Sequence, residues 1–184
     1  EGCGRLTQNM VLTAPGRSGL AYPEFKIARS SEVLTDFMLP SLEVAGPGMH
    51  WVEVSRAVAA AGTELSDDTK RMAEAYGEYF EAACTAMRAG ATCHDVHIAV
   101  SKGFSDRGYH LGHVTGHSIG MTMIEHPKIG EGVETELAAD MVLSMHPHAI
   151  APNGEDCLYM QDTWLVTPDG GVPLAQLEMG VWFR

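Results

Sequence analysis

A change of hydrophobic periodicity constrains the fold of this chain more than any other feature. In the middle of the sequence, apolar side chains recur every three or four positions, which predicts two amphipathic helices at 66–89 and 92–107. Ser66 suits the start of the first helix, and Gly90 and Gly108 suit the helix ends. On both sides of the helices, short runs of strand-forming residues alternate with Gly and Pro turns. A helical block between strands predicts the α+β class.

The expected strands fall into two groups. Before the helices, residues 40–46 and 49–57 are typical of a hairpin around the turn 46–48, and shorter strands are expected at 9–13 and 25–29. After the helices, we expect strands near 111–116, 121–125, 141–150 and 157–167.

Composition limits the class of protein. A chain of 184 residues with 45% hydrophobic residues is long enough for one domain with its own core. The net charge of −12 argues against a nucleic-acid partner, and no apolar run is long enough to span a membrane. The four cysteines are widely spaced and no signal-peptide pattern is visible, so we expect reduced thiols and a cytoplasmic protein.

The stretch from Gly112 to Gly120 contains the strongest candidate site. His113 and His117 are four residues apart, and in a strand this spacing places both imidazoles on one face. Two imidazoles on one face can bind a metal ion or transfer protons. The same spacing is typical of hydrogen-bonded histidines in a tightly packed sheet, so a structural role stays open.

Two more pairs lie on expected strands. Glu43 and Glu53 are ten residues apart on the two arms of the hairpin, so a tight turn would bring their side chains together. Solvated glutamates are nevertheless common on such a face. His146 and His148 alternate along a strand and therefore share one of its faces.

Gln161 and Asp162 fall inside an apolar strand. Buried side chains of this kind need hydrogen-bond partners. For Asp162, a structural carboxylate that accepts backbone N–H groups is as good an interpretation as a ligand.

Taken in order, five segments resemble the catalytic domain of the creatinase, prolidase and aminopeptidase P superfamily. Residues 43–56 resemble its first metal-binding hairpin, and residues 112–120 resemble its glycine- and histidine-rich strand. The helix junction and the two last strands of the family are similar to residues 88–92, 140–147 and 161–170. The resemblance implies a pita-bread fold, in which a curved antiparallel sheet is flanked by helices.

The resemblance also implies how the chain is divided. Residues 39–184 would form the creatinase- or aminopeptidase-like catalytic domain. Residues 1–38 would be an N-terminal segment, a remnant of or link to the separate N-terminal domain that family members usually carry. Because family members are typically dimers, we expect a homodimer with a pocket that can borrow residues from the partner.

Most metal-ligand positions of the family are altered here. Metal-dependent members use two Asp, one His and two Glu, and the resemblance places these five ligands at Glu43, Glu53, His117, His146 and Gln161. Two metal ions need carboxylates to balance their charge, and this set supplies at most two. We therefore do not expect a dinuclear Mn or Co centre. A second family His falls on Ile124, whereas His113 matches a family His that contacts substrate or moves protons.

Two catalytic designs remain. In a metal-free design like that of creatinase, the acid–base groups would be His113, His117, His146 and Glu53, and the substrate-binding groups would be Gln161, His148 and Glu43. In the other design, one Fe, Zn or Mn ion would bind to Glu53, His117 and His146, because two imidazoles and a carboxylate suit these metals.

The leading hypothesis is a hydrolase-like enzyme that acts on a C–N bond of a small polar substrate without a dinuclear centre. One alternative is a mononuclear metal-dependent hydrolase or lyase of the same fold. Another is a catalytically inactive pita-bread domain that serves as a binding module, since the fold alone does not determine function.

Overall fold

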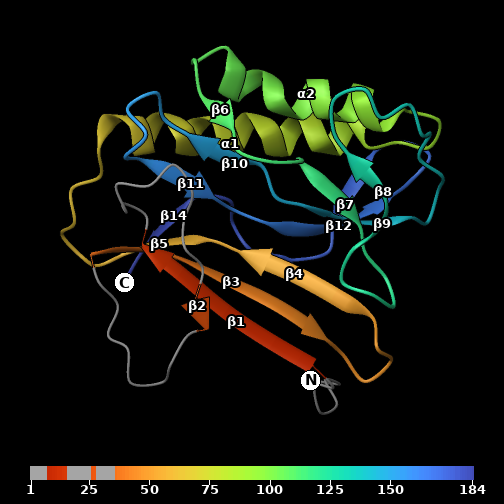
Figure 1. Cartoon of the computed structure of the whole chain (residues 1–184), viewed down its shortest axis with the longest axis horizontal. Coiled ribbons are helices and arrows are strands. Elements are labelled where there is room, and N and C mark those ends of the chain that lie inside the picture. Colours follow the sequence, from red (N-terminus) through yellow and green to blue (C-terminus); the bar gives the residue numbers. More distant parts are fainter. Residues whose placement is uncertain (1–7, 16–25, 28–35) are drawn as a thin grey trace.

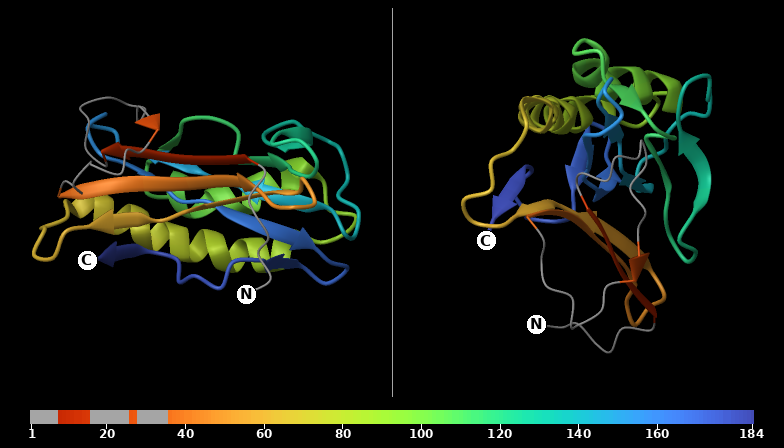
Figure 2. Two further views of the ribbon diagram at one scale, coloured as in Figure 1. Left: turned by 90° about the horizontal axis from the view of Figure 1, so that it is seen from below. Right: turned by 60° about the vertical axis from the view of Figure 1, so that its left-hand side comes forward.

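The computed structural model describes residues 8–15, 26–27 and 36–184. Two helices lie side by side along one face of curved strands, and a long hairpin forms the opposite edge of the molecule (Figure 1). The views from below and from the side show the strands curling beneath the helices (Figure 2). This arrangement confirms the predicted α+β class.

Both predicted helices are present. They are α1 (Asp67–Ala86) and α2 (Cys93–Ser105). Ser66 caps α1 by accepting a hydrogen bond from the backbone of the first turn, and Thr92 caps α2 in a reciprocal capping box. α1 ends three residues before the predicted position, because the chain after it pairs with Thr167 instead of continuing the helix.

The first sheet contains the predicted hairpin. β3 (Phe37–Ala45) and β4 (Trp51–Ser55) are antiparallel, with a turn at residues 46–50. The rest of this sheet consists of β1 (Gln8–Pro15), β2 (Lys26–Ile27), β5 (Ala57–Ala59) and β14 (Val181–Phe183). β1 pairs with β3 along its full length, and β14 with β5 is the one parallel pair among the described strands.

Two smaller antiparallel sheets lie between this hairpin and the helices (Figure 1). One has the order β11 (Cys157–Tyr159), β10 (His148–Ile150) and β6 (His110–Leu111). The other has the order β13 (Gly171–Pro173), β12 (Asp162–Val166), β9 (Val142–Met145), β7 (Gly116–Ser118) and β8 (Glu125–Ile129).

The predicted strand at 111–116 is wrong. The N–H of Gly112 donates to His148 in the three-stranded sheet, whereas the N–H of Thr115 donates to Ile129 in the five-stranded sheet. The chain therefore crosses from one sheet to the other within four residues. Sequence periodicity cannot reveal such a crossing, because the residues remain strand-like on both sides.

The two strands expected near the C-terminus each divide at the same junction. The run 141–150 breaks at His146 into β9 and β10, and the run 157–167 breaks at Gln161 into β11 and β12. Both breaks fall on candidate site residues, so the site lies where the sheets meet. The strand predicted at 121–125 is also wrong: these residues mostly form a turn, and the strand β8 begins at Glu125.

The core lies between α1 and the strands. Tyr76, Tyr79, Phe104 and Trp164 are buried there and meet in edge-to-face contacts. Helix and sheet approach closely at Gly170, where a Cβ atom would lie 1.9 Å from the Cys84 carbonyl oxygen. Glycine is therefore required at the predicted turn between β12 and β13.

The structure bears on two expectations from composition, the absence of a membrane span and the reduced state of the cysteines. No helix among the described residues is long and apolar enough to cross a membrane. The described cysteines, Cys84, Cys93 and Cys157, form no disulfide with one another, and Cys3 lies outside the described residues.

Candidate active site

A cavity of about 330 Å³ opens at the junction of the sheets. Its lining residues come from β3 and β4 of the first sheet and from β7 and β8 of the five-stranded sheet. His146 and Gln161, at the two strand breaks, also line it. The lining residues are Glu43, Glu53, His113, Val114, His117, Met123, Ile124, Lys128, His146, Tyr159 and Gln161. The chain thus gathers six of the seven predicted site residues around one cavity.

Glu43 and Glu53 face each other across the hairpin. They are register partners on β3 and β4, so their side chains lie on the same face of the sheet. Burial raises the pKa of both carboxyl groups, and the nearby Glu43 charge contributes to the rise at Glu53. The predicted convergence of this pair is therefore correct.

Glu53 is the most tightly held acidic group of the site. One of its oxygens accepts hydrogen bonds from the Ser144 hydroxyl and the Gln161 amide. Its backbone is fixed by Thr163, whose hydroxyl accepts from the Glu53 N–H at 2.8 Å and donates to its carbonyl at 2.9 Å. Desolvation outweighs these bonds and raises the pKa of Glu53 to about 7. The carboxyl group can therefore gain or lose a proton near neutral pH.

His117 presents one ring nitrogen to Glu53. Its Nδ1 lies 2.9 Å from the Ser118 carbonyl oxygen, which can only accept, so Nδ1 carries the proton. Burial lowers the pKa of the imidazole, which keeps the ring neutral. The lone pair is then on Nε2, and this atom lies 4.0 Å from a Glu53 carboxylate oxygen.

His146 lies between two other imidazoles. Its ring centroid is 5.0 Å from that of His113 and 5.0 Å from that of His117. Burial, reinforced by the neighbouring histidines, lowers its pKa to about 3, so the ring is neutral. Its Nδ1 is buried and has no hydrogen-bond partner among the described residues.

His113 and His148 differ in exposure although both are near His146. His113 is exposed at the rim of the cavity, with Nδ1 2.8 Å from the Val114 carbonyl oxygen. His148 is 1% exposed and lies beside His113, with ring centroids 5.5 Å apart. It is not among the described residues that line the cavity, so its predicted contact with substrate stays a prediction.

The donor set is suited to one divalent ion. Ligand atoms of Glu53, His117 and His146 all lie within 4.8 Å of one another. A tetrahedral ion with ligands at ~2.1 Å would space its donors by roughly 3.4 Å, so small side-chain movements would close the set. The unpartnered nitrogen of His146 fits this use, because a buried imidazole nitrogen without a partner is otherwise unfavourable.

Asp162 is a buried structural carboxylate, but its partner is the Arg56 side chain and not the backbone N–H groups that the sequence analysis expected. Both its oxygens accept from one guanidinium nitrogen of Arg56, at 2.9 and 3.0 Å, and both side chains are buried. Asp162 is not among the described residues that line the cavity.

Several residues of the site were missed by sequence reasoning. Ser144 binds Glu53 directly, and Ser41 donates to the Gln161 amide oxygen at 3.0 Å. Lys128 and Tyr159 line the cavity. For Ser144 a signal existed, because a serine inside the apolar run 142–145 needs a buried partner.

Comparison with known proteins shows which family the chain resembles. Residues 32–168 match the model of metallopeptidase family M24. Comparison with curated protein sequences gave no significant match.

Solved structures with a similar fold include three peptidases. The dipeptidase PepE of Mycobacterium ulcerans has a TM-score of 0.79 at 24% identity over 99% of this chain and 48% of its own. The X-Pro aminopeptidase of Thermotoga maritima gives 0.78 at 19% identity, over 100% of this chain and 51% of its own. The prolidase of Pyrococcus furiosus gives 0.76 at 20% identity, over 96% of this chain and 51% of its own.

The chain spans about half the length of these three structures. The likeness confirms the predicted pita-bread fold, with curled sheets beneath two helices. Because the family model covers more than half of the chain and the fold agrees, the chain belongs to metallopeptidase family M24.

Proposed function

We propose that the protein is a hydrolase that cleaves a C–N bond in a small polar molecule. One observation carries this proposal: a buried carboxyl group, Glu53, lies beside two neutral imidazoles in a cavity of about 330 Å³. This volume suits a small molecule. Membership of a peptidase family supports the reaction type.

The residues suggest how protons would move. Hydrolysis adds water to the carbon atom, breaks the C–N bond and delivers a proton to the leaving nitrogen. With a pKa of about 7, Glu53 is suited to accept the proton of the attacking water. His113, at the exposed rim, is suited to return a proton to the leaving nitrogen. The amide of Gln161 would orient the substrate without adding charge.

A single divalent ion is a second candidate feature of the same site. The close donor set of Glu53, His117 and His146, together with the unpartnered His146 nitrogen, favours it. Such an ion would polarise the scissile group and lower the pKa of a bound water. The chain's own contribution would be two neutral imidazoles and one carboxylate, which suit Fe, Zn or Mn.

Turnover of a small substrate panel tests the proposal. The panel contains Xaa-Pro dipeptides and creatine, and product release is followed by chromatography. We expect His117→Ala and His146→Ala to lower kcat/KM at least about 100-fold while the chain stays folded by circular dichroism. The control His50→Ala alters an exposed histidine on the hairpin turn and should leave turnover unchanged. Full activity of both site variants would refute the proposal.

Metal analysis separates the two versions of the site. Elemental analysis of the purified protein, followed by turnover in chelator, should give about one equivalent of metal and loss of activity if an ion is used. Less than about a tenth of an equivalent, with activity intact in chelator, would exclude the metal-dependent version. A protein with no turnover under any metal would leave a binding module as the better account.

A further inference from the structure

Thr115 holds the chain where it enters the five-stranded sheet. Its N–H donates to the carbonyl oxygen of Ile129, at the end of β8, at 3.0 Å, and its own carbonyl oxygen accepts from the His146 N–H at 2.8 Å. His117 follows two residues later in β7. The backbone of Thr115 therefore positions both imidazoles of the donor set, His146 through a hydrogen bond and His117 through the chain itself.

A side chain of α2 holds Thr115 in turn. Thr115 is buried, and its hydroxyl oxygen lies 2.6 Å from Nδ1 of His97. In the described part of the chain, this hydroxyl has no other hydrogen-bond partner. A buried hydroxyl without a partner is unfavourable, so the contact with His97 satisfies the polar end of the Thr115 side chain.

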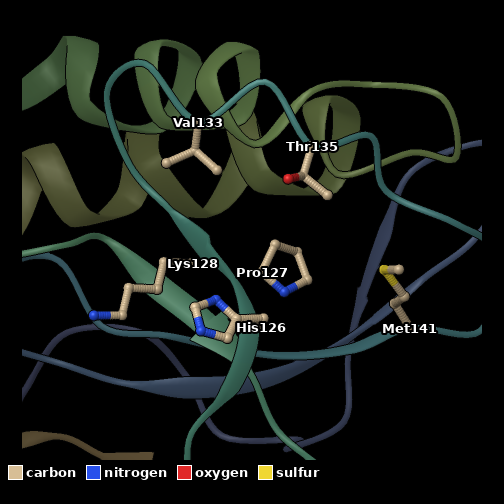
Figure 3. Close-up of a pocket in the computed structure, with 6 residues that line it drawn as sticks. All are labelled: His126, Pro127, Lys128, Val133, Thr135 and Met141. Carbon is tan, nitrogen blue, oxygen red and sulfur yellow. The ribbon is translucent and has the colours of Figure 1, made fainter.

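Packing alone leaves room between α2 and β8. A cavity of about 450 Å³ is bordered by α2, by Lys128 of β8 and by the loop after β8. A further cavity of about 530 Å³ lies beside β8, and Figure 3 shows Pro127 and Val133 among the side chains around it. Side chains that face a cavity lack neighbours on one side, so they fix the spacing of α2 and β8 less firmly than a filled interface would. The directional hydrogen bond from α2 to Thr115 therefore matters more for this spacing.

We propose that His97 is a positioning residue of the active site. Its Nδ1 holds the Thr115 hydroxyl, and this keeps the Thr115 carbonyl oxygen on the His146 N–H and the two imidazoles, His146 and His117, in their places around the cavity. The inference rests on the proposed function, in which these imidazoles lie beside Glu53 at the reacting atoms. His97 is not among the described residues that line the catalytic cavity, so it acts through Thr115.

Hydrogen exchange of the His146 amide, followed by NMR, tests the contact without any substrate. His97→Leu fills a similar volume but offers no hydrogen bond, so we expect exchange at His146 to become about three- to tenfold faster. The N–H of Ser55, which donates to the Gln161 carbonyl oxygen at the other strand break, is the reference and should keep its rate. Equal acceleration at both amides would indicate a general loss of stability and would contradict the inference.

Two amide side chains separate the hydrogen bond from the bulk of the imidazole. Asparagine can place a nitrogen or oxygen atom where Nδ1 lies, whereas the longer glutamine reaches the position of Nε2. His97→Asn should therefore keep the slow exchange at His146, and His97→Gln should behave like His97→Leu. Thr115→Val removes the hydroxyl and should speed exchange equally, with no further effect when it is combined with His97→Leu. The matched control is His94→Ala, which removes another histidine of α2, one that accepts from the Gly132 N–H, and it should change nothing at His146.

Turnover by the same variants tests the effect on the reaction. With whichever Xaa-Pro dipeptide or creatine the unaltered chain hydrolyses fastest, His97→Leu should lower kcat about tenfold and change KM less than about twofold, and His97→Asn should restore most of kcat. Unchanged exchange at His146 in His97→Leu, failure of His97→Asn to restore it, or an unchanged kcat would overturn the inference. Absence of turnover by the unaltered chain would instead count against the proposed function, and the exchange rates would still decide whether His97 holds His146 in place.

Discussion

Replacing Arg56 by Met should strongly destabilise the protein, because Arg56 is one partner of a buried ion pair. The guanidinium group is 4% exposed and forms an ion pair with Asp162, which is 0% exposed. It also donates to the carbonyl groups of Ser55 and Gln161, and to those of the C-terminal residues Leu177 and Glu178. One side chain thus joins three parts of the chain behind the site.

The expected loss of unfolding free energy follows from the buried Asp162 carboxylate, which the substitution leaves without its partner. Removing one partner of a buried ion pair typically costs about 3–5 kcal/mol, because the remaining charge is buried without compensation. A domain of this size is stable by roughly 5–15 kcal/mol, so a large part of its stability would be lost. The double variant R56M/D162L removes both charges and should recover the part of this loss that comes from the unpaired carboxylate, while the four carbonyl groups still lack the Arg56 donor.

Urea unfolding followed by circular dichroism measures the effect. Arg71→Met is the matched control, because Arg71 also pairs with an aspartate, Asp68, but lies on the exposed side of α1. We expect the control to unfold at nearly the same urea concentration as the unaltered chain. A midpoint shift for Arg56→Met no larger than that for Arg71→Met would contradict this expectation, and so would a double variant less stable than Arg56→Met alone.

Four further substitutions test a close backbone approach, an open helix position, a helix cap and a buried hydrogen bond. Gly116→Ala would place a Cβ atom 2.4 Å from the Ser144 carbonyl oxygen and should cost at least about 1–3 kcal/mol in urea unfolding, whereas Gly77→Ala on the open face of α1 should stabilise by about 0.5–1 kcal/mol. Thr92→Ala removes the cap of α2 and should cost about 1 kcal/mol; an unchanged midpoint would contradict this. Tyr76→Phe leaves the Met160 N–H without its acceptor and should cost about 1–3 kcal/mol by the same assay, with retention of full stability as the contrary result.

The local features of the fold could be predicted from the sequence. The helices depend on apolar spacing and on caps such as Ser66 and Thr92, which act within one turn. The hairpin depends on the turn at residues 46–50, and this turn alone places Glu43 opposite Glu53. These features can be predicted because the residues that form them are close together in the sequence.

The breaks in the later strands could not be predicted. At Gly112, His146 and Gln161 the chain leaves one sheet and joins another, and the deciding partners are far away in sequence. An apolar run has the same pattern whether it continues in one sheet or crosses to the next. The boundary at residue 38 between two parts of the chain also stays a prediction, and the whole length of β1, which comes from the earlier part, pairs with β3.

By itself, the sequence determined which residue types were available: the carboxylates of Glu43 and Glu53, the imidazoles of His113, His117 and His146, and the amide of Gln161. Only the tertiary structure decided how they act. It buried Glu53, and this desolvation raises the pKa of Glu53 to about 7 although hydrogen bonds from Ser144 and Gln161 oppose the rise. It also left His113 exposed while the neighbouring His148 is buried. Protonation and access depend on desolvation and on distant partners, and these exist only once the sheets have met.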